Sequence, residues 1–452
     1  MKYRLHMGIW SGLRLLVGLL LSWSILGLSA RAQPAPPPVV DLTLGASTQG
    51  RPITAVRIGV GPRKLVLVGA THGWPERNTY QLAQLLIEHF RARPWEVPPE
   101  ISLYIVPLLN PDGYALQRRQ NANIVDLNRN MDTSADRCPE NDWRQRAEGA
   151  RGIVGDIGGP YSESEVEARL IRDFLLDAWA VILFHSNAGV VFPACEHAPS
   201  QALARLYAEA AGYAYLPKWD RYAITGGMHD WAGGLGIAAV TPELVSGDQP
   251  EFEQNLAGVR AVLAHAELLP APQDQQVNGL PVDAIIWRAW RAWGGMRLFG
   301  APLAPPQRQA DGEVRQLFER AELAYQPARS ASTRVVEVRP LGRELFGALA
   351  APPAAPVAGA RFFPETGQSV SAPFAAFWQI NGGLPIFGLP LAPEAPDLDA
   401  AGRPVIRQLF ERAVLQRSPA ATDAAAVTLL PLGRIVWAQQ DAYVPSAAVR
   451  PR

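Results

Sequence analysis

The chain has 452 residues, of which 48% are hydrophobic, and its 42 Lys and Arg balance its 42 Asp and Glu. This length exceeds what one hydrophobic core usually supports, so we expect two or more domains. The balanced charge gives no basic excess of the kind that binds nucleic acid, and the chain has no acidic tail.

The N-terminus has the pattern of a secretory signal peptide at residues 1–32. Lys2 and Arg4 give it a positive start, an apolar run follows at residues 15–28, and Ala-Arg-Ala at residues 30–32 fits a small-x-small cleavage site. The run is shorter than the roughly 20 apolar residues of a spanning helix, although a membrane anchor is the alternative interpretation. We therefore expect a protein that is secreted, extracellular or associated with the cell envelope.

The chain has two cysteines, Cys138 and Cys195. In an exported protein an even number of cysteines favours a disulfide, and two buried free thiols are the alternative. The bridge would join the loop after Asn130 to the loop after His185. A metal-binding role is disfavoured because neither cysteine has a second Cys or His at ligand spacing.

A Pro/Ala linker at residues 33–41 precedes a first domain that we place at residues 42–269. Its apolar patterns predict strands at residues 64–68, 101–109, 180–184 and 237–240 and helices at residues 77–90 and 163–178. Ser162 and Glu165 are spaced as a capping box for the second helix, so we assign Glu163 and Glu165 to capping rather than to acid–base chemistry. The alternation predicts an α/β fold with a mixed central sheet flanked by helices.

Three side chains in this domain have the character of metal ligands. His72 follows the apolar run at residues 64–68, Glu76 comes one short turn later, and His185 closes the run at residues 180–184. A lone histidine at a strand end is usually an ordinary buried residue, but the carboxyl ends of sheet strands are where ligands gather in such folds. Two His, one Glu and an open position describe a catalytic zinc site with one ion per chain.

Five further sequence motifs in this domain bear on its function. They are an Asn-Pro-Asp-Gly turn at residues 110–113, an Asn-Arg pair at Asn128 and Arg129, a Ser-Glu-x-Glu helix start, a His-Ser strand end, and Glu243 after an apolar strand. With the His…Glu pair, this order resembles the zinc metallocarboxypeptidases of the carboxypeptidase A/B type over residues 42–268. The short spacing at residues 119–130 is most similar to the bacterial branch, which includes enzymes acting on cell-wall peptides.

The resemblance implies a role for each of these residues. His72, Glu76 and His185 would hold zinc, which acidifies water and polarises a carbonyl. Glu243 would act as general base and then as general acid. Its alternative is an ordinary surface glutamate.

The resemblance also implies roles for the basic residues. Arg119 would stabilise the oxyanion, with Arg118 as the alternative. Asn128 and Arg129 would bind the terminal carboxylate of the substrate, since an arginine fork binds a carboxylate in a bidentate way. A structural salt bridge is the alternative role for Arg129.

The chain departs from the family pattern in two places. The family spaces its first ligands as His-x-x-Glu, whereas three residues separate His72 from Glu76, so the loop must bulge and the metal site could be weakened. Alignment on Asp230-Trp231 places Gly233 where the family has a mobile tyrosine that covers the substrate, so that contact is expected to be absent or to come from elsewhere. We interpret His197 and His229 as supporting or loop residues rather than ligands.

The remainder of the chain contains a duplicated region. Arg-Gln-Leu-Phe-Glu-Arg-Ala occurs at residues 315–321 and again at residues 407–413. We place linkers at residues 270–283 and 347–361 and the repeats at residues 284–346 and 362–440. The repeats resemble the Leu-Gly-Phe-Pro-type repeats of secreted bacterial proteins, which implies association with the cell envelope. Trp287, Trp290, Trp293 and Trp378 are interpreted as core residues, with a sugar-stacking surface as the alternative.

The sequence therefore predicts a secreted zinc carboxypeptidase that acts on a peptide. A close variant is an amidase that trims peptidoglycan stem peptides, and a different class is an envelope-binding protein that has lost zinc. The pocket for the substrate side chain should lie between residues 188 and 244. No buried charge is evident there, so we assign no side-chain preference.

Overall fold

The computed structural model describes residues 36–149, 152, 154–327 and 334–442. The proposed signal peptide lies outside these residues. Within the described ranges, no helix combines the length and the hydropathy needed to cross a membrane.

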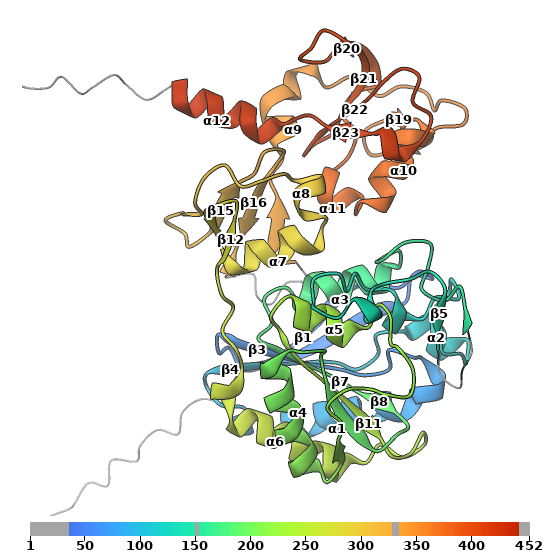
Figure 1. Ribbon diagram of the computed structural model, residues 1–452, viewed down its shortest axis with the longest axis vertical. Coiled ribbons are helices and arrows are strands. Elements are labelled where there is room, and N and C mark those ends of the chain that lie inside the picture. Colours follow the sequence, from blue (N-terminus) through green and yellow to red (C-terminus); the bar gives the residue numbers. More distant parts are fainter. Residues whose placement is uncertain (1–35, 150–151, 153, 328–333, 443–452) are drawn as a thin grey trace, which may run out of the picture. The chain divides into compact units, whose positions relative to one another are not determined.

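A mixed nine-stranded sheet forms the centre of the first domain (Figure 1). Its main order is β1-β2-β4-β3-β7-β11-β9-β10, and β8 pairs with β11. The strands are β1 (Val39–Ala46), β2 (Pro52–Ile58), β3 (Arg63–Val68), β4 (Ile101–Val106), β7 (Ala180–Leu183), β8 (His185–Ser186), β9 (Val190–Pro193), β10 (Ala214–Tyr215) and β11 (Ala238–Leu244). The central strands β4, β3, β7 and β11 run parallel, whereas β1, β2 and β9 supply antiparallel pairs. The predicted fold class is confirmed.

Helices cover both faces of this sheet. The helices are α1 (Arg77–Ala92), α4 (Ala198–Ala211) and α6 (Phe252–Ala264) on one face, and α3 (Val166–Leu175) and α5 (Met228–Gly234) on the other (Figure 1). Alternate residues of a strand point to opposite faces, so Leu65 and Leu67 of β3 pack with the first group and Val66 and Val68 pack with the second. Burial on both faces explains why the central strands are continuous apolar runs.

The predicted capping box at Ser162 is wrong. Helix α3 begins at Val166, and the Glu165 at its N-cap makes no side-chain capping bond. The carboxylate of Glu165 instead accepts hydrogen bonds from Asn121 and Asn123, at 2.7 Å each. Glu163 forms a buried ion pair with Arg172. Both carboxylates therefore hold loops against α3, and neither lines the cavity described below.

The two C-terminal segments contain the same succession of elements. Each has a hairpin, two helices, a four-stranded sheet and a final helix. In the first they are β12 (Gln275–Val277), β13 (Leu280–Val282), α7 (Ala284–Ala292), α8 (Gly295–Leu298), β14 (Gln307–Arg308), β15 (Val314–Leu317), β16 (Glu322–Tyr325), β17 (Val336–Val338) and α9 (Leu341–Phe346). In the second they are β18 (Arg361–Phe363), β19 (Gln368–Val370), α10 (Ala372–Ile380), α11 (Leu384–Phe387), β20 (Ala395–Leu398), β21 (Pro404–Leu409), β22 (Val414–Arg417), β23 (Thr428–Leu429) and α12 (Leu432–Ala442). Residues 270–283, expected to be a linker, thus include a hairpin that corresponds to β18–β19.

The final helix of each segment packs on the other segment. The backbone N–H of Arg343 in α9 donates to Glu411 O at 2.8 Å, and that of Arg434 in α12 donates to Glu319 O at 3.1 Å. Each arginine also forms an ion pair with the same glutamate. A Cβ at Gly342 would lie 2.1 Å from Phe410 O, which explains the glycine of the repeated Pro-Leu-Gly motif. The last helix of each segment therefore packs against the other segment.

The tryptophans of this region belong mainly to the core. Trp290, Trp293 and Trp378 are buried, and the partly buried Trp287 packs against the same cluster. The indole N–H of Trp290 donates to Gly300 O at 3.0 Å, and that of Trp378 donates to Gly388 O at 3.1 Å. The interpretation of these residues as core aromatics is confirmed.

Cys138 and Cys195 form the expected disulfide, with an S–S distance of 2.01 Å. The bridge closes a loop of 57 residues that joins the segment after Asn130 to the segment after β9. Since a cross-link restricts the unfolded chain, we expect the double Cys138→Ser, Cys195→Ser variant to lose about 4 kcal/mol of unfolding free energy. Urea titration of the oxidised protein and the variant would measure this. Equal transition midpoints would contradict the prediction.

Candidate active site

The three predicted metal ligands meet at the carboxyl ends of neighbouring strands. His72 follows β3, Glu76 lies in the short helix Trp74–Glu76, and His185 begins β8. Glu243 pairs in register with His185 across β8 and β11. The side chains of His72, Glu76 and His185 are buried. The sheet therefore brings together proposed ligands that lie up to 113 positions apart in the chain.

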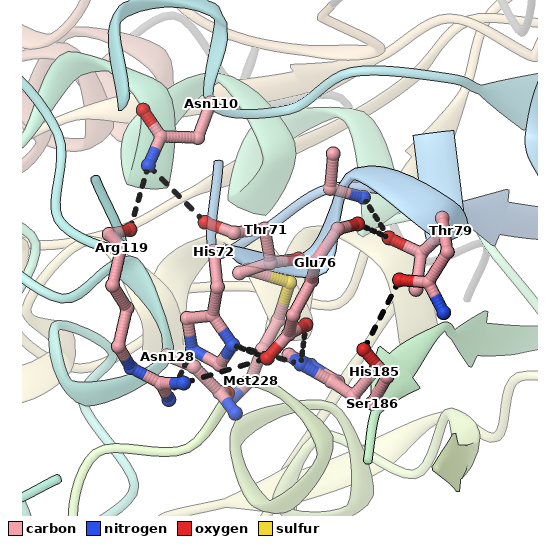
Figure 2. A network of polar contacts seen from close by, with 12 residues as sticks. Thr71, His72, Glu76, Thr79, Asn110, Arg119, Asn128, His185, Ser186 and Met228 are labelled. Carbon is pink, nitrogen blue, oxygen red and sulfur yellow. Dashed lines mark hydrogen bonds and ion pairs between the residues drawn. The ribbon is translucent and has the colours of Figure 1, made fainter. Parts of the chain in front are cut away.

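The donor atoms of these three side chains converge (Figure 2). Nδ1 of His72 lies 2.6 Å from Glu76 Oε1 and 3.1 Å from His185 Nδ1, and His185 Nδ1 lies 3.0 Å from Glu76 Oε2. Bonds of about 2.0–2.1 Å to zinc place tetrahedral ligand atoms about 3.3 Å apart. Two imidazole nitrogens and a carboxylate at these separations fit the ligand set of a zinc ion with one open position.

The electrostatics of His185 and Glu76 suit metal binding. Burial lowers the pKa of His185 to about 4, so its ring is neutral at physiological pH. Burial acts against ionisation of Glu76, but His72 and His185 hold the pKa of its carboxyl well below the ordinary value. A neutral imidazole and an ionised carboxylate are the forms that bind a metal.

Gly73 accommodates the extra residue between the first two ligands. It has a φ of 52°, which favours glycine, and a Cβ there would lie 2.5 Å from Arg118 O. The short helix Trp74–Glu76 follows, with Pro75 in its first turn. The bulge that the His-x-x-x-Glu spacing requires is present, and it delivers Glu76 to His72.

Asp126 is a further residue of the site, and no sequence motif indicates its role. Its Oδ1 lies 3.0 Å from His72 Nε2, and its Oδ2 accepts a hydrogen bond from Arg119 Nε at 2.9 Å. Arg119 Nη2 also lies 2.7 Å from His72 Nε2, and the two contacts require opposite tautomers of the ring. Donation from Nε2 to Asp126 leaves the lone pair on Nδ1, which is the atom that faces Glu76 and His185.

We expect Asp126→Asn to weaken zinc binding by about 10- to 100-fold, because the partner that fixes the His72 tautomer loses its charge. Competition with a chromogenic chelator would measure the affinity. Asp156→Asn is a matched control, since Asp156 is exposed and pairs with Arg146 at the surface. Equal zinc affinities of the two variants would show that Asp126 does not act on the metal site.

The contacts of Arg119 and Arg118 show which of these two arginines belongs to the site. The guanidinium of Arg119 contacts Asp126, Glu76 and His72 and lines the cavity beside them. Arg118 instead donates to the backbone oxygens of Asn121 and Ala122, at 2.6 and 2.7 Å. Asn110 fixes this arrangement, because its amide donates both to Thr71 O and to Arg119 O (Figure 2). Of the two candidates, Arg119 is the one at the site.

A cavity of about 510 Å³ opens beside the ligands. It is lined by His72, Glu76, Arg119, Asn128, Arg129, Glu148, Gly152, Ser186, Asn187, Trp219, Arg221, Tyr222, Ile224 and Glu243. Of the predicted catalytic, substrate-binding and metal-binding residues, all except His185 line this one cavity.

Arg129 lines this cavity, and its guanidinium is held in place by the backbone. Its Nε donates to Glu148 O at 2.8 Å and its Nη1 to Asn128 O at 2.7 Å, which fixes the guanidinium. Its Nη2 is buried and has no hydrogen-bond partner among the described residues. The Oδ1 of Asn128 accepts from the backbone N–H of Met228 at 2.9 Å. A buried cation with an unused donor is a binding point for an anionic group.

Glu243 is the remaining carboxylate at the metal cluster. Burial and the nearby negative charge of Glu76 raise the pKa of Glu243 to about 8. A bound dication would favour the ionised form and lower this pKa. The arrangement therefore offers a carboxyl group that can hold or release a proton near neutral pH, as a general base requires.

Tyr222 is a tyrosine of the cavity that the sequence alignment did not identify. That alignment placed Gly233 at the position of the family's tyrosine, but Gly233 lies against Ala194 and His197 and does not line the cavity. Tyr222 does line it, and its ring centroid lies 5.6 Å from Cζ of Arg129. Burial raises the pKa of the Tyr222 hydroxyl, although Arg129 and Arg119 oppose this. A tyrosine thus reaches the cavity from elsewhere in the chain.

The spare histidines do not join the ligand cluster. His197 Nδ1 lies 2.7 Å from Ser200 Oγ, and His229 Nε2 lies 3.2 Å from Asp230 Oδ2. Asp230 is only 4% exposed. The expectation that no buried charge lies between residues 188 and 244 is therefore wrong, because an isolated Asp-Trp pair carries no sequence signal of the burial that it has in α5.

Comparison with known proteins gives the family. The zinc carboxypeptidase family model matches residues 31–256, which is half of the 452 residues. Carboxypeptidase SOL1 of Arabidopsis thaliana is 27% identical over 225 residues, covering 42% of each chain. Bacteriocin BCN5 of Clostridium perfringens is 37% identical over 81 residues, which is 16% of this chain and 8% of the bacteriocin. The chain spans less than half the length of these curated relatives.

Solved structures are similar at lower identity. Carboxypeptidase A from Helicoverpa armigera is 21% identical, with a TM-score of 0.40, and the match covers 52% of this chain and 70% of that one. The murein-tripeptide amidase of Escherichia coli O157 is 22% identical, with a TM-score of 0.38 and coverage of 53% and 96%. On the family match, the chain belongs to the zinc carboxypeptidase family of hydrolytic metallopeptidases.

Proposed function

We propose that this protein is an exported, zinc-dependent carboxypeptidase that hydrolyses the last peptide bond of its substrate. The single observation that carries this proposal is the fixed, buried guanidinium of Arg129, whose Nη2 has no hydrogen-bond partner among the described residues, in the wall of the cavity that His72, Glu76 and Glu243 also line. An endopeptidase has no use for a fixed cation of this kind, whereas an enzyme that removes terminal residues must recognise a free carboxylate. Arg129 and Asn128 would bind that carboxylate.

His72, Glu76 and His185 would hold the zinc ion. When bound, zinc supplies a Lewis acid that polarises the scissile carbonyl and lowers the pKa of water to about 7. Glu243 takes a proton from the attacking water as the oxygen of the water bonds to the carbonyl carbon. Glu243 then passes this proton to the leaving amine as the C–N bond breaks. The guanidinium of Arg119 is positioned to stabilise negative charge on the carbonyl oxygen. Tyr222 covers the substrate on the side of Arg129.

Two features support export. The signal-peptide pattern at residues 1–32 directs a chain to the secretory route, and disulfides persist in oxidising compartments. We further propose that the duplicated C-terminal unit associates with the cell envelope, on the basis of its resemblance to repeats of secreted bacterial proteins. A substrate available there is a peptidoglycan stem peptide, which the same residues could hydrolyse.

Mass spectrometry of a mixed peptide library and of stem peptides tests the proposal. The mature protein, purified without chelator, would be incubated with both substrates, and zinc would be measured by elemental analysis. Loss of single C-terminal residues, abolished by a chelator and restored by zinc, is the expected result. Cleavage of stem peptides alone would make the enzyme a wall-peptide amidase. Absence of both zinc and cleavage would favour an envelope-binding protein and overturn the proposal.

A further inference from the structure

The first turn of α1 contacts the other elements of the candidate site. Glu76 is the N-cap of this helix, and Asn78 and Thr79 follow it in the first turn. The side chains of Asn78 and Thr79 are both buried. A buried polar side chain must find its hydrogen bonds within the protein, so the partners of these two residues show what the turn holds in place.

Thr79 joins the turn to the loop that carries the first proposed ligand. Its Oγ1 accepts a hydrogen bond from the backbone N–H of Ala70 at 2.9 Å and donates to Glu76 O at 2.8 Å (Figure 2). Ala70 lies two residues before His72, so the bond spans the segment that contains both His72 and Glu76. Thr79 therefore holds the two ends of the bulged ligand loop together.

Asn78 joins the same turn to β8 and to the segment after β11. Its Nδ2 donates to Ser246 O at 2.6 Å and to Gln249 O at 3.1 Å. Its Oδ1 accepts from Ser186 Oγ at 3.1 Å, and Ser186 directly follows the proposed ligand His185. Backbone oxygens only accept, so the amide nitrogen must face them and the amide oxygen is left for the hydroxyl. One buried amide thus bonds to two separate parts of the site.

The segment after β11 bears directly on Glu243. Strand β11 ends one residue after Glu243, so Ser246 lies only three residues beyond it. Glu243 and His185 are partners in the ladder between β11 and β8. Because β8 has only two residues, this ladder is short, and the amide of Asn78 adds a bond from α1 on each side of it.

The same segment lies near the cavity of the candidate site. A Cβ at Gly247 would lie 3.6 Å from Nδ2 of Asn187, which lines that cavity. Arg77 also reaches this segment through an ion pair with Asp248, but the two side chains are 33% and 69% exposed. Exposed pairs contribute little to stability, so the buried amide of Asn78 is the stronger tie between α1 and the segment.

We propose that Asn78 is a positioning residue that holds the strand of His185 and the strand of Glu243 in place against Glu76. The inference rests on the proposed hydrolytic function, in which Glu243 moves the proton of the attacking water. Asn78 is buried and does not line the cavity, so it acts through Ser186 and through the segment after β11. A misplacement of about 1 Å in a catalytic group can cost about 100-fold in rate.

Asn78→Ala tests the inference in the zinc-loaded mature protein. We expect kcat for a cleaved peptide to fall by about 10- to 100-fold while KM stays within about twofold, because the substrate-binding residues are untouched. Gln408→Ala is the matched control, since Gln408 is also buried and its amide also donates to two backbone oxygens, at 2.9 and 3.1 Å, in the second C-terminal segment. The control should leave kcat unchanged. Equal values of kcat in the two variants would contradict the inference.

Combination with Glu243→Gln separates positioning from a general loss of structure. If Asn78 acts by placing the base, Asn78→Ala should change the residual kcat of the Glu243→Gln variant by less than about twofold, because the effects of residues that act as a unit are not additive. A purely structural role would instead multiply the two losses in the double variant. Such multiplication would overturn the inference.

A spectrum of the cobalt(II)-substituted protein gives a readout without substrate. The visible absorption of cobalt(II) depends on the geometry of its ligands, so Asn78→Ala should shift the bands and Gln408→Ala should not. Ser186→Ala removes only the hydroxyl that bonds to Asn78, so it should fold even if Asn78→Ala does not, and it should shift the bands to a smaller extent. Spectra identical to wild type would overturn the inference. If the wild type cleaves no peptide, the proposed function fails and these spectra alone decide the inference.

Discussion

Replacement of Glu243 by glutamine is expected to lower kcat/KM for peptide hydrolysis by about 10²- to 10⁴-fold, the usual contribution of a general acid–base residue. Glutamine has nearly the same shape but cannot accept the proton of the attacking water. Because Glu243 is not one of the three converging ligands, zinc content should not change. Steady-state kinetics and elemental analysis of the same preparation would measure both. Loss of zinc together with activity would place Glu243 in the metal site instead.

The same variant has a predictable effect on the stability of the metal-free protein. Burial and Glu76 raise the pKa of Glu243 to about 8 in the folded state, from an ordinary value of 4.5. The folded protein then holds a proton that the unfolded chain has lost, so this stabilisation is complete below about pH 4.5 and disappears as the pH rises through about 8. Denaturant unfolding in the presence of chelator would give the unfolding free energies of wild type and Glu243→Gln. We expect the unfolding free energy of the variant to rise relative to that of wild type as the pH increases over this interval. A difference independent of pH would contradict the raised pKa.

The metal site was largely predictable because each ligand has a local signal. His72 and His185 end continuous apolar runs, and such runs become central strands whose ends meet at one sheet edge. Glu76 was assigned in spite of its unusual spacing, and Gly73 supplies the backbone conformation that the extra residue needs. The disulfide could be predicted from the signal-peptide pattern and from an even cysteine count.

The residues that were missed or misassigned depend on contacts distant in the chain. Asp126 matters because it meets His72, which is 54 residues away, and no periodicity marks such a pair. Tyr222 lies in an irregular segment before α5, where no helix or strand pattern marks it, and its ring lies near Arg129, which is distant in the chain. Glu165 has the spacing of a capping residue, but two asparagines compete for its carboxylate and the helix starts later. Local propensity failed where tertiary hydrogen bonds were available.

The second large effect is expected at Arg129. Arg129→Lys keeps a positive charge but loses the fork that is fixed by Glu148 O and Asn128 O. We expect kcat/KM for peptides with a free terminal carboxylate to fall by about 10²- to 10³-fold, the scale of losing a buried, charge-assisted contact. Peptides with an amidated terminus cannot make this contact, so their slow cleavage should be unchanged and the discrimination between the two should collapse.

This discrimination distinguishes a binding role from a structural one. If Arg129 only supported the fold, both classes of peptide would lose rate together and the unfolding temperature would fall. If it binds the carboxylate, the loss is confined to the free acids, while zinc content and unfolding temperature stay close to wild type. The separate effects on KM and kcat then show at which stage the contact between Arg129 and the carboxylate acts. A rise in KM alone means that the contact is equally strong in the bound substrate and in the transition state. A fall in kcat means that the contact positions the scissile bond against Glu243.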